Sequence, residues 1–186
     1  MDVLTKAGAP ARSPLDPPRL EFVRGNTALA AIRRSLPLLQ RSTAGFYKKS
    51  GCVSCHHNSL TAHTVKLARS NGLPIDGAMA AAHARRLPPF LDSWRDSTLR
   101  GFGIPGGQDT VGYVVWGAEG AGVEPDAATD AMIYYLKGLQ LPDGRWRVQT
   151  MRPPIESSDI EVTALAMRSL QFYAPPAWRE EYAKAI

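Results

Sequence analysis

The residues with the clearest chemical potential lie in segment 51–57, which contains both cysteines of the chain and two of its four histidines. Cys52, Cys55 and His56 form a Cys-x-x-Cys-His pattern, the attachment signature of c-type haem. The two thiols bond covalently to the porphyrin, and the adjoining histidine ligates the iron from one face. The pattern therefore predicts a covalent haem c held by these three residues.

Three other interpretations of the two cysteines stay open. A buried thiol pair packs as two small hydrophobic side chains. A redox disulfide of the thioredoxin type needs a surrounding β-α-β pattern, which this sequence lacks. A zinc site needs further ligands. Because there is no second cysteine pair, zinc would have to recruit histidines, and the candidates are His56, His57, His63 and His83.

A haem iron ligated by His56 has a second axial position, and spacing limits what can fill it. His57 adjoins His56, so its side chain points elsewhere. On one continuous helix His63 would lie about 10 Å from His56 along the axis, so it serves only if the helix begins after His56. We expect His83, on the second helix of the same hairpin, to be the ligand, with His63 next. An open or water-bound position is the remaining alternative.

Length and composition favour one globular domain, or one domain plus a fragment. The 186 residues are 44% hydrophobic and 21% charged. The net charge of +5 is scattered, without the dense basic run of a nucleic-acid-binding arm. Lys48 and Lys49 precede the cysteine motif, where they would attract an acidic redox partner protein.

No apolar run reaches membrane-spanning length, and residues 1–8 lack the apolar region of a signal peptide. Since c-type haem is normally attached outside the cytoplasm, we expect a periplasmic or extracytoplasmic protein. Its export signal would then lie upstream of this chain.

The chain divides into three predicted parts. Residues 1–20 form a proline-rich linker. Residues 21–57 form an N-terminal helical segment with the haem-like motif, in which Asn26 or Thr27 caps a helix that Pro37 kinks or divides. Residues 58–186 carry the repeat described next.

An internal repeat with a spacing of 50 residues organises the rest of the sequence. Gly72 and Gly122 each end a first helix, and Asp76 and Asp126 each cap a second, alanine-rich helix. The pattern predicts αα-hairpins and an all-α fold. The helices expected run from Leu60 to near Gly72, paired with 77–87; from Val111 to near Gly122, paired with 127–139; and over 160–173, followed by one starting near Trp178.

Residues 140–146, Gln-Leu-Pro-Asp-Gly-Arg-Trp, carry a family resemblance. They resemble the Gln-Trp motif of the squalene-hopene and oxidosqualene cyclases, Gln-x-x-Asp/Glu-Gly-x-Trp, at every fixed position. The resemblance implies part of an α/α toroid, built from αα-hairpin repeats, over residues 58–186. We expect Gln140 to bond helix-end backbone and Trp146 to pack beneath the turn, both without chemistry.

The same resemblance bears on catalysis. Residues 159–164 align with the cyclase acid motif Asp-x-Asp-Asp-Thr-Ala, and Glu161 falls on the position of the acid. Val162 replaces the neighbouring Asp, which removes the partner that strengthens this acid. The related protein prenyltransferases use zinc held by Asp, Cys and His, and no such constellation is visible here.

Residues 2–9 resemble the closing helix and turn of an ankyrin repeat. Together, the parts resemble bacterial exported proteins with ankyrin repeats, a Cys-x-x-Cys-His segment and a cyclase-like toroid. The leading hypothesis is a c-type haem domain for electron transfer or redox sensing. The alternatives are a toroid that binds an apolar ligand or a protein without catalysis, and a cyclase-class enzyme using Glu161.

Overall fold

The computed structural model describes Lys6, Gly8 and residues 27–50, 53, 56–153 and 155–184. Within these ranges the fold is all-α, without a strand, which confirms the expected class. The helices are α2 (Ala28–Ser50), α3 (His56–Ser70), α4 (Gly77–Ala84), α5 (Leu87–Leu99), α6 (Gly107–Ala121), α7 (Ala127–Gly138), α8 (Asp159–Tyr173) and α9 (Arg179–Ala183), with a 3-10 turn η1 (Pro176–Trp178) before α9.

The helix ends of the repeat form as the sequence predicts. The Asp76 carboxylate accepts a hydrogen bond from the Met79 amide at 2.9 Å and caps α4. Asp126 and Thr129 form a reciprocal capping box at the start of α7, which satisfies amides that have no partner within the helix. Gly122 ends α6 with φ of 75°, a left-handed conformation that favours glycine.

Two boundary predictions were wrong. Helix α3 begins at His56, four residues before the expected Leu60, and α6 likewise begins at Gly107 and not at Val111. A third boundary also differs: α4 ends at Ala84, three residues before the expected end at 87, and a separate helix, α5, begins at Leu87. Prolines 88 and 89 follow at once, and proline is tolerated in the first helical turn but not in a helix interior.

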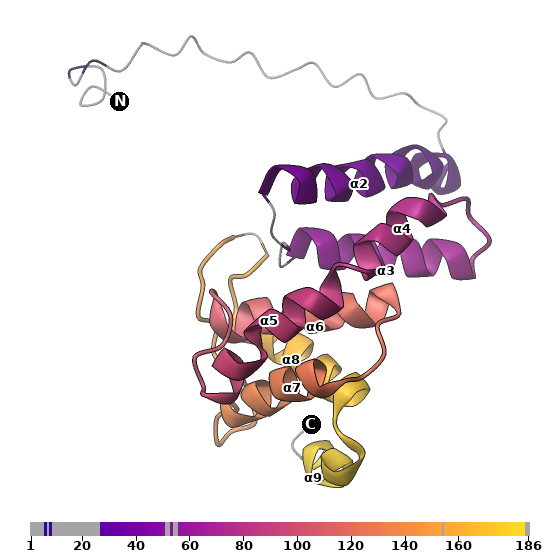
Figure 1. The fold of residues 1–186 in the computed structure, drawn as a ribbon. Helices are drawn as coiled ribbons and strands as arrows, with labels where there is room; N and C mark the ends of the chain where they lie inside the picture. The colour runs from indigo at the N-terminus through magenta and orange to yellow at the C-terminus, as the bar shows by residue number, and fades with distance from the viewer. Residues whose placement is uncertain are drawn as a thin grey trace.

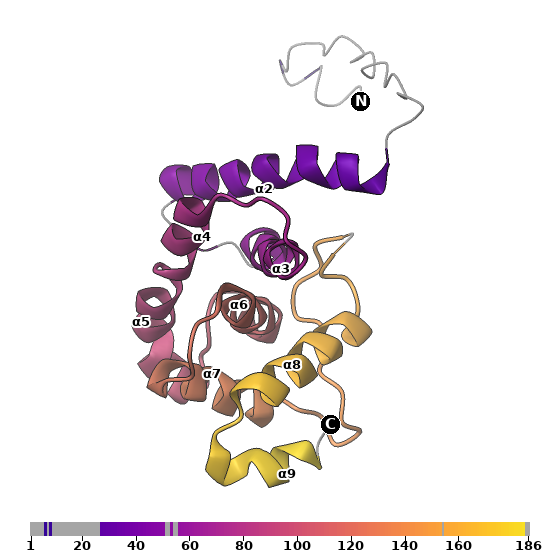
Figure 2. The same cartoon turned by 90° about the vertical axis from the view of Figure 1, so that its right-hand side faces the viewer.

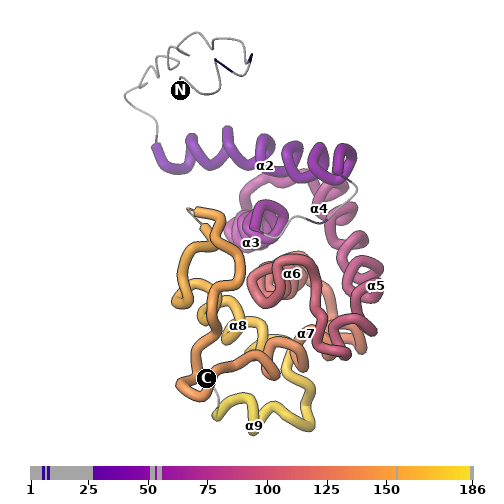
Figure 3. Tube along the Cα trace, turned by 90° about the vertical axis from the view of Figure 1, so that its left-hand side faces the viewer, coloured from indigo at the N-terminus to yellow at the C-terminus, as the bar shows by residue number. Residues whose placement is uncertain are grey.

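Helices α3, α6 and α8 are successive neighbours, while α5 lies against α7 on one side of them (Figure 1). Figure 2 views α3 and α6 nearly end-on, with α2 crossing above them, α4 and α5 along one flank, and α9 at the far end. The tube in Figure 3 shows the same stacking from the opposite side. Helix α2 runs through Pro37 as one element, so this proline does not begin a second helix.

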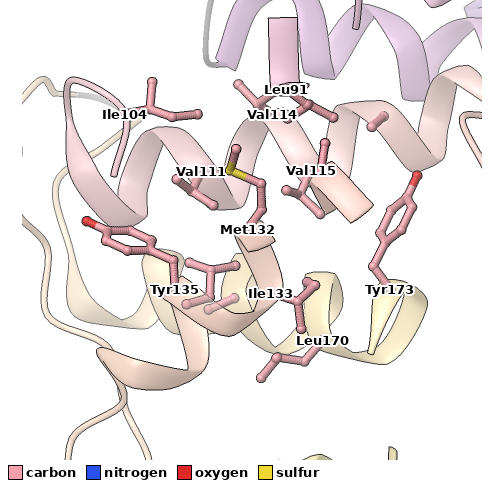
Figure 4. Close-up of a cluster of buried hydrophobic side chains, with 14 of the residues drawn as sticks. Leu91, Ile104, Val111, Val114, Val115, Met132, Ile133, Tyr135, Leu170 and Tyr173 are labelled. Carbon is pink, nitrogen blue, oxygen red and sulfur yellow. The ribbon is translucent and has the colours of Figure 1, made fainter. Parts of the chain in front are cut away.

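The main core lies around α6 (Figure 4). Val111, Val114 and Val115 of α6 are completely buried. They pack with Met132 and Ile133 of α7, and the same cluster takes in further apolar residues of α5 and α8. Burial of this kind contributes about 25 cal/mol per Å² of apolar surface, and it fixes the frame that carries the site residues.

In segment 140–146 Trp146 is buried as expected, whereas Gln140 bonds backbone within the segment and not at the end of a helix. Gln140 donates from Nε2 to the Gly144 carbonyl at 2.9 Å. Trp146 is fully buried and donates from Nε1 to the Leu136 carbonyl, at the end of α7, at 2.6 Å. The segment therefore joins the end of α7 to the long connection before α8.

In the described part of the chain, none of the helices combines the length and the apolar character that a membrane crossing requires.

Candidate functional site

The cysteine motif occupies the connection between α2 and α3. Cys52 and Cys55 themselves lie outside the described residues. Val53, between them, is buried in the main core cluster. His56 is the first residue of α3, so the start of this helix fixes where the histidine of the motif lies.

His56 is paired with a buried carboxylate distant in the sequence. Its Nδ1 lies 3.2 Å from Glu156 Oε1, and the His56 side chain is 39% exposed while that of Glu156 is 0% exposed. A metal-ligating histidine usually donates one ring N–H to a carboxylate and binds the metal through the other nitrogen. The Glu156 contact through Nδ1 is the arrangement that such a histidine shows.

Glu156 is held in an uncommon backbone conformation. Its φ is 67°, the only positive value among the described residues other than glycine, and such strain persists only where the surroundings enforce it. Oε2 lies 3.2 Å from Thr150 Oγ1 and pairs with Arg152 Nε. The Glu156 carbonyl accepts the Arg152 amide at 2.8 Å. These contacts aim the carboxylate at α3.

Asp109 ties this loop to α6. It is fully buried and lies in the first turn of the helix. Its carboxylate accepts the Gln149 amide at 3.1 Å, and the Thr150 amide and hydroxyl at 2.6 and 2.7 Å. Since Thr150 in turn bonds Glu156, Asp109 helps to position the carboxylate that orients His56.

Glu161, aligned with the cyclase acid, is occupied by structural contacts. It accepts the Tyr113 hydroxyl, the Glu156 amide at 3.1 Å and the Ser157 amide at 3.4 Å. Its own amide bonds the Ser158 hydroxyl that caps α8. Glu161 lines neither of the two cavities described below. Its contacts with the Glu156 and Ser157 amides hold the loop against α8.

A cavity of about 480 Å³ lies beside the motif. We call it the motif cavity. Its two histidines are His56 and His57, and His57 Nε2 lies 3.3 Å from Ser42 Oγ. The phenyl ring of Phe46 provides an apolar wall and Lys49 provides a positive charge. Its lining residues are Ser42, Gly45, Phe46, Lys49, His56 and His57.

His63 shares α3 with His56 but is engaged elsewhere. The helix is continuous over both residues, which separates them by about 10 Å along the axis. His63 Nε2 lies 2.7 Å from the Trp116 carbonyl, and its ring stacks on Trp116 at 3.8 Å. Burial is the main cause that lowers the pKa of His63. Gly120 permits this close approach, since a Cβ there would lie 2.8 Å from His63 Cδ2.

His83 lies on the other side of α2 from the motif cavity. Its Nδ1 is 2.6 Å from the Tyr47 hydroxyl, and burial, aided by the Arg86 charge, lowers its pKa to about 4. Tyr47 lies on the same α2 face as Gln40 and Thr43. The α2 residues of the motif cavity, Ser42, Gly45, Phe46 and Lys49, follow the i, i+3, i+4, i+7 spacing of the opposite face. The structure thus brings neither His63 nor His83 to His56.

In the described part of the chain, no three or more His, Cys, Asp or Glu side chains gather as a group able to hold a metal ion. No protein-family model, curated protein or solved structure matches this chain.

Sequence reasoning missed Glu156 and Asp109. Glu156 lies before the helix predicted over 160–173, in a stretch where we singled out no residue, 100 residues from His56. The only local feature that could have indicated its role is Arg152, four residues earlier. That spacing predicts an ion pair on a helix, and no helix was expected there.

Proposed function

We propose that this chain is a c-type haem-binding helical domain for electron transfer or redox sensing. Cys52 and Cys55 would carry the thioether bonds, and His56 would ligate the iron. The observation that carries the proposal is the His56–Glu156 contact at 3.2 Å, directly after the Cys-x-x-Cys pattern. When bound, the haem supplies reversible one-electron chemistry at iron.

The chain's own residues suit such a group. Glu156 would fix the ring orientation of His56 by accepting the proton of Nδ1. The motif cavity offers an apolar wall, and Lys49 on its lining carries a positive charge. Lys48 and Lys49 lie in the last turn of α2. Their positive charges would attract an acidic redox partner protein.

The proposal keeps Cys52, Cys55 and His56 and leaves the second axial position open or water-bound. His83 bonds Tyr47 on the far face of α2, and His63 bonds Trp116. Zinc bound by the cysteines with His56 is the alternative metal, because the same histidine geometry would serve it.

The architecture proposed is part of an α/α toroid. The packing of α3, α6 and α8 in succession, with α5 against α7, suits inner and outer helices of such a ring. Haem attachment also implies a periplasmic or extracytoplasmic setting.

The test is maturation of the protein in a host with haem-attachment machinery, followed by a pyridine haemochrome assay and metal analysis. We expect covalent haem at one per chain, lost in the Cys52→Ala and Cys55→Ala variants. His57→Ala is the matched control for His56→Ala, and only the latter should change iron ligation. Protein that contains zinc and no covalent haem would overturn the proposal.

A further inference from the structure

We propose that a second cavity, between α2, α3, α4 and the end of α6, binds a small, uncharged, mainly apolar molecule through one hydroxyl or carbonyl group. We call it the α4 cavity. Its volume of about 720 Å³ falls within the roughly 300–1,000 Å³ of known ligand pockets. Its apolar lining includes Ala62, Val65, Ala80, Val123, Pro125 and Phe172.

Two buried polar atoms of the cavity lining lack a partner. His83 is 7% exposed and Thr43 is 4% exposed. Neither His83 Nε2 nor Thr43 Oγ1 has a hydrogen-bond partner within the described part of the chain. Buried polar atoms are almost always paired, and leaving one unpaired is costly. A ligand oxygen within hydrogen-bond reach of either atom would remove this cost.

The chemistry of this pair selects a neutral group. Burial holds the pKa of His83 at about 4, so at pH 7 the ring is neutral and carries one N–H. One ring nitrogen bonds Tyr47, which leaves Nε2 as a single donor or acceptor beside a hydroxyl that can act as either. A hydroxyl or carbonyl group matches this pair. A charged group would lose its hydration beside a neutral imidazole and a hydroxyl, neither of which carries an opposite charge.

The charged residues of the lining do not favour an ionic ligand. Lys66 and Arg69 are balanced by Glu119 and Glu124. Lys66 is also ion-paired with Glu119, so these side chains offer no net charge. The rest of the ligand would contact the alanine, valine and aromatic side chains of the lining, so it should be apolar.

The α4 cavity is separate from the cysteine motif. The two cavities share no lining residue: Gln40 and Thr43 of α2 line the α4 cavity, whereas Ser42 and Phe46 line the motif cavity. On α3, Val65 and Arg69 lie about 180–220° around the helix from His56, at 100° per residue. The inference therefore does not rest on haem attachment.

Calorimetric titration of the full chain with nonan-1-ol tests the proposal, with nonanoate as the charged probe of equal chain length. We expect saturable binding of one alcohol per chain and binding of nonanoate at least about tenfold weaker. Thr43→Val removes only the unpaired hydroxyl and should weaken alcohol binding about three- to tenfold. Thr64→Val, on α3 outside the cavity, is the matched control and should leave binding unchanged.

A second pair of variants separates a lost contact from lost folding. Ala81 is exposed on the cavity lining, so Ala81→Trp should block alcohol binding without lowering the melting temperature. His83→Gln keeps a hydrogen-bonding group and should retain more affinity than His83→Leu. The proposal is overturned if nonan-1-ol shows no saturable binding, if nonanoate binds as tightly, or if Thr43→Val and Ala81→Trp both bind like the wild type.

Discussion

At the scale of single residues, the site depends on one carboxylate in a constrained loop. Glu156 combines complete burial, a φ of 67° and contacts to His56, Arg152 and Thr150. The sequence predicted His56 because the motif around it is local. It did not predict Glu156, because the partnership joins residues 100 positions apart and depends on how the loop packs against α3.

Replacing Glu156 with glutamine should destabilise the fold by about 1–3 kcal/mol, since the amide places an N–H against Arg152 or His56 and leaves a buried donor unpaired. Urea unfolding measures this. Glu180→Gln is the matched control, because Glu180 is exposed and pairs with exposed Lys184. This variant should leave the unfolding midpoint unchanged. Equal midpoints for both variants would show that the Glu156 contacts do not stabilise the loop.

The buried histidine His83 should make stability depend on pH. Its pKa is lowered to about 4 in the folded protein, from 6.5 when unfolded. Between these values the unfolded chain binds the extra proton, so this contribution is fully present above pH 6.5 and is lost as the pH falls toward 4. The loss should reach about 3 kcal/mol.

His83→Leu provides the measurement, through urea unfolding at several pH values. The variant should have a shallower decline in stability than the wild type between pH 6.5 and 4. Some decline will remain, because burial lowers the pKa of His63 in the same direction. A wild-type slope in His83→Leu would contradict the assignment of a buried, neutral His83.

At the scale of helices, the sequence predicted the capping residues of α4 and α7 correctly but placed the first residues of α3 and α6 too late. Asp76 and Asp126 cap their helices as expected, because capping depends on a few adjacent residues. The start of α3 was placed too late, because the repeat was taken to begin at Leu60, after the cysteine motif. Helix α5 was missed between Leu87 and Leu99 because Pro88 and Pro89 were not interpreted as a first turn.

The segment around Trp146 should be a major source of stability between α7 and α8. Trp146→Ala should destabilise by about 3–5 kcal/mol, because the side chain is completely buried. Trp146→Phe, which keeps an aromatic ring but loses the Nε1 bond to Leu136, should cost less. Trp178→Ala, at a site 41% exposed, is the surface control. A loss within the error of the urea melt would reject the structural role.

At the scale of the whole molecule, α2 separates two environments. The motif cavity, with His56 and His57, lies on one side. The α4 cavity, with His83, lies on the other. The sequence could place His83 on a second helix but not on a face, because the crossing of α4 over α2 depends on non-local packing, such as the Gln40 side chain on the Asp76 backbone at 2.8 and 2.9 Å.

This separation yields a prediction for haem-loaded protein. His83 is bonded to Tyr47 across the α2–α4 contact, whereas His56 contacts Glu156, so we expect His83 to take no part in ligating iron held by His56. His83→Leu should therefore leave the reduced visible spectrum and its spin state unchanged. His57→Leu, within the motif cavity, is the comparison variant for a change made close to the iron. A shift from low-spin to high-spin in His83→Leu alone would mean that His83 is the second axial ligand and that the α2–α4 packing differs in the loaded protein.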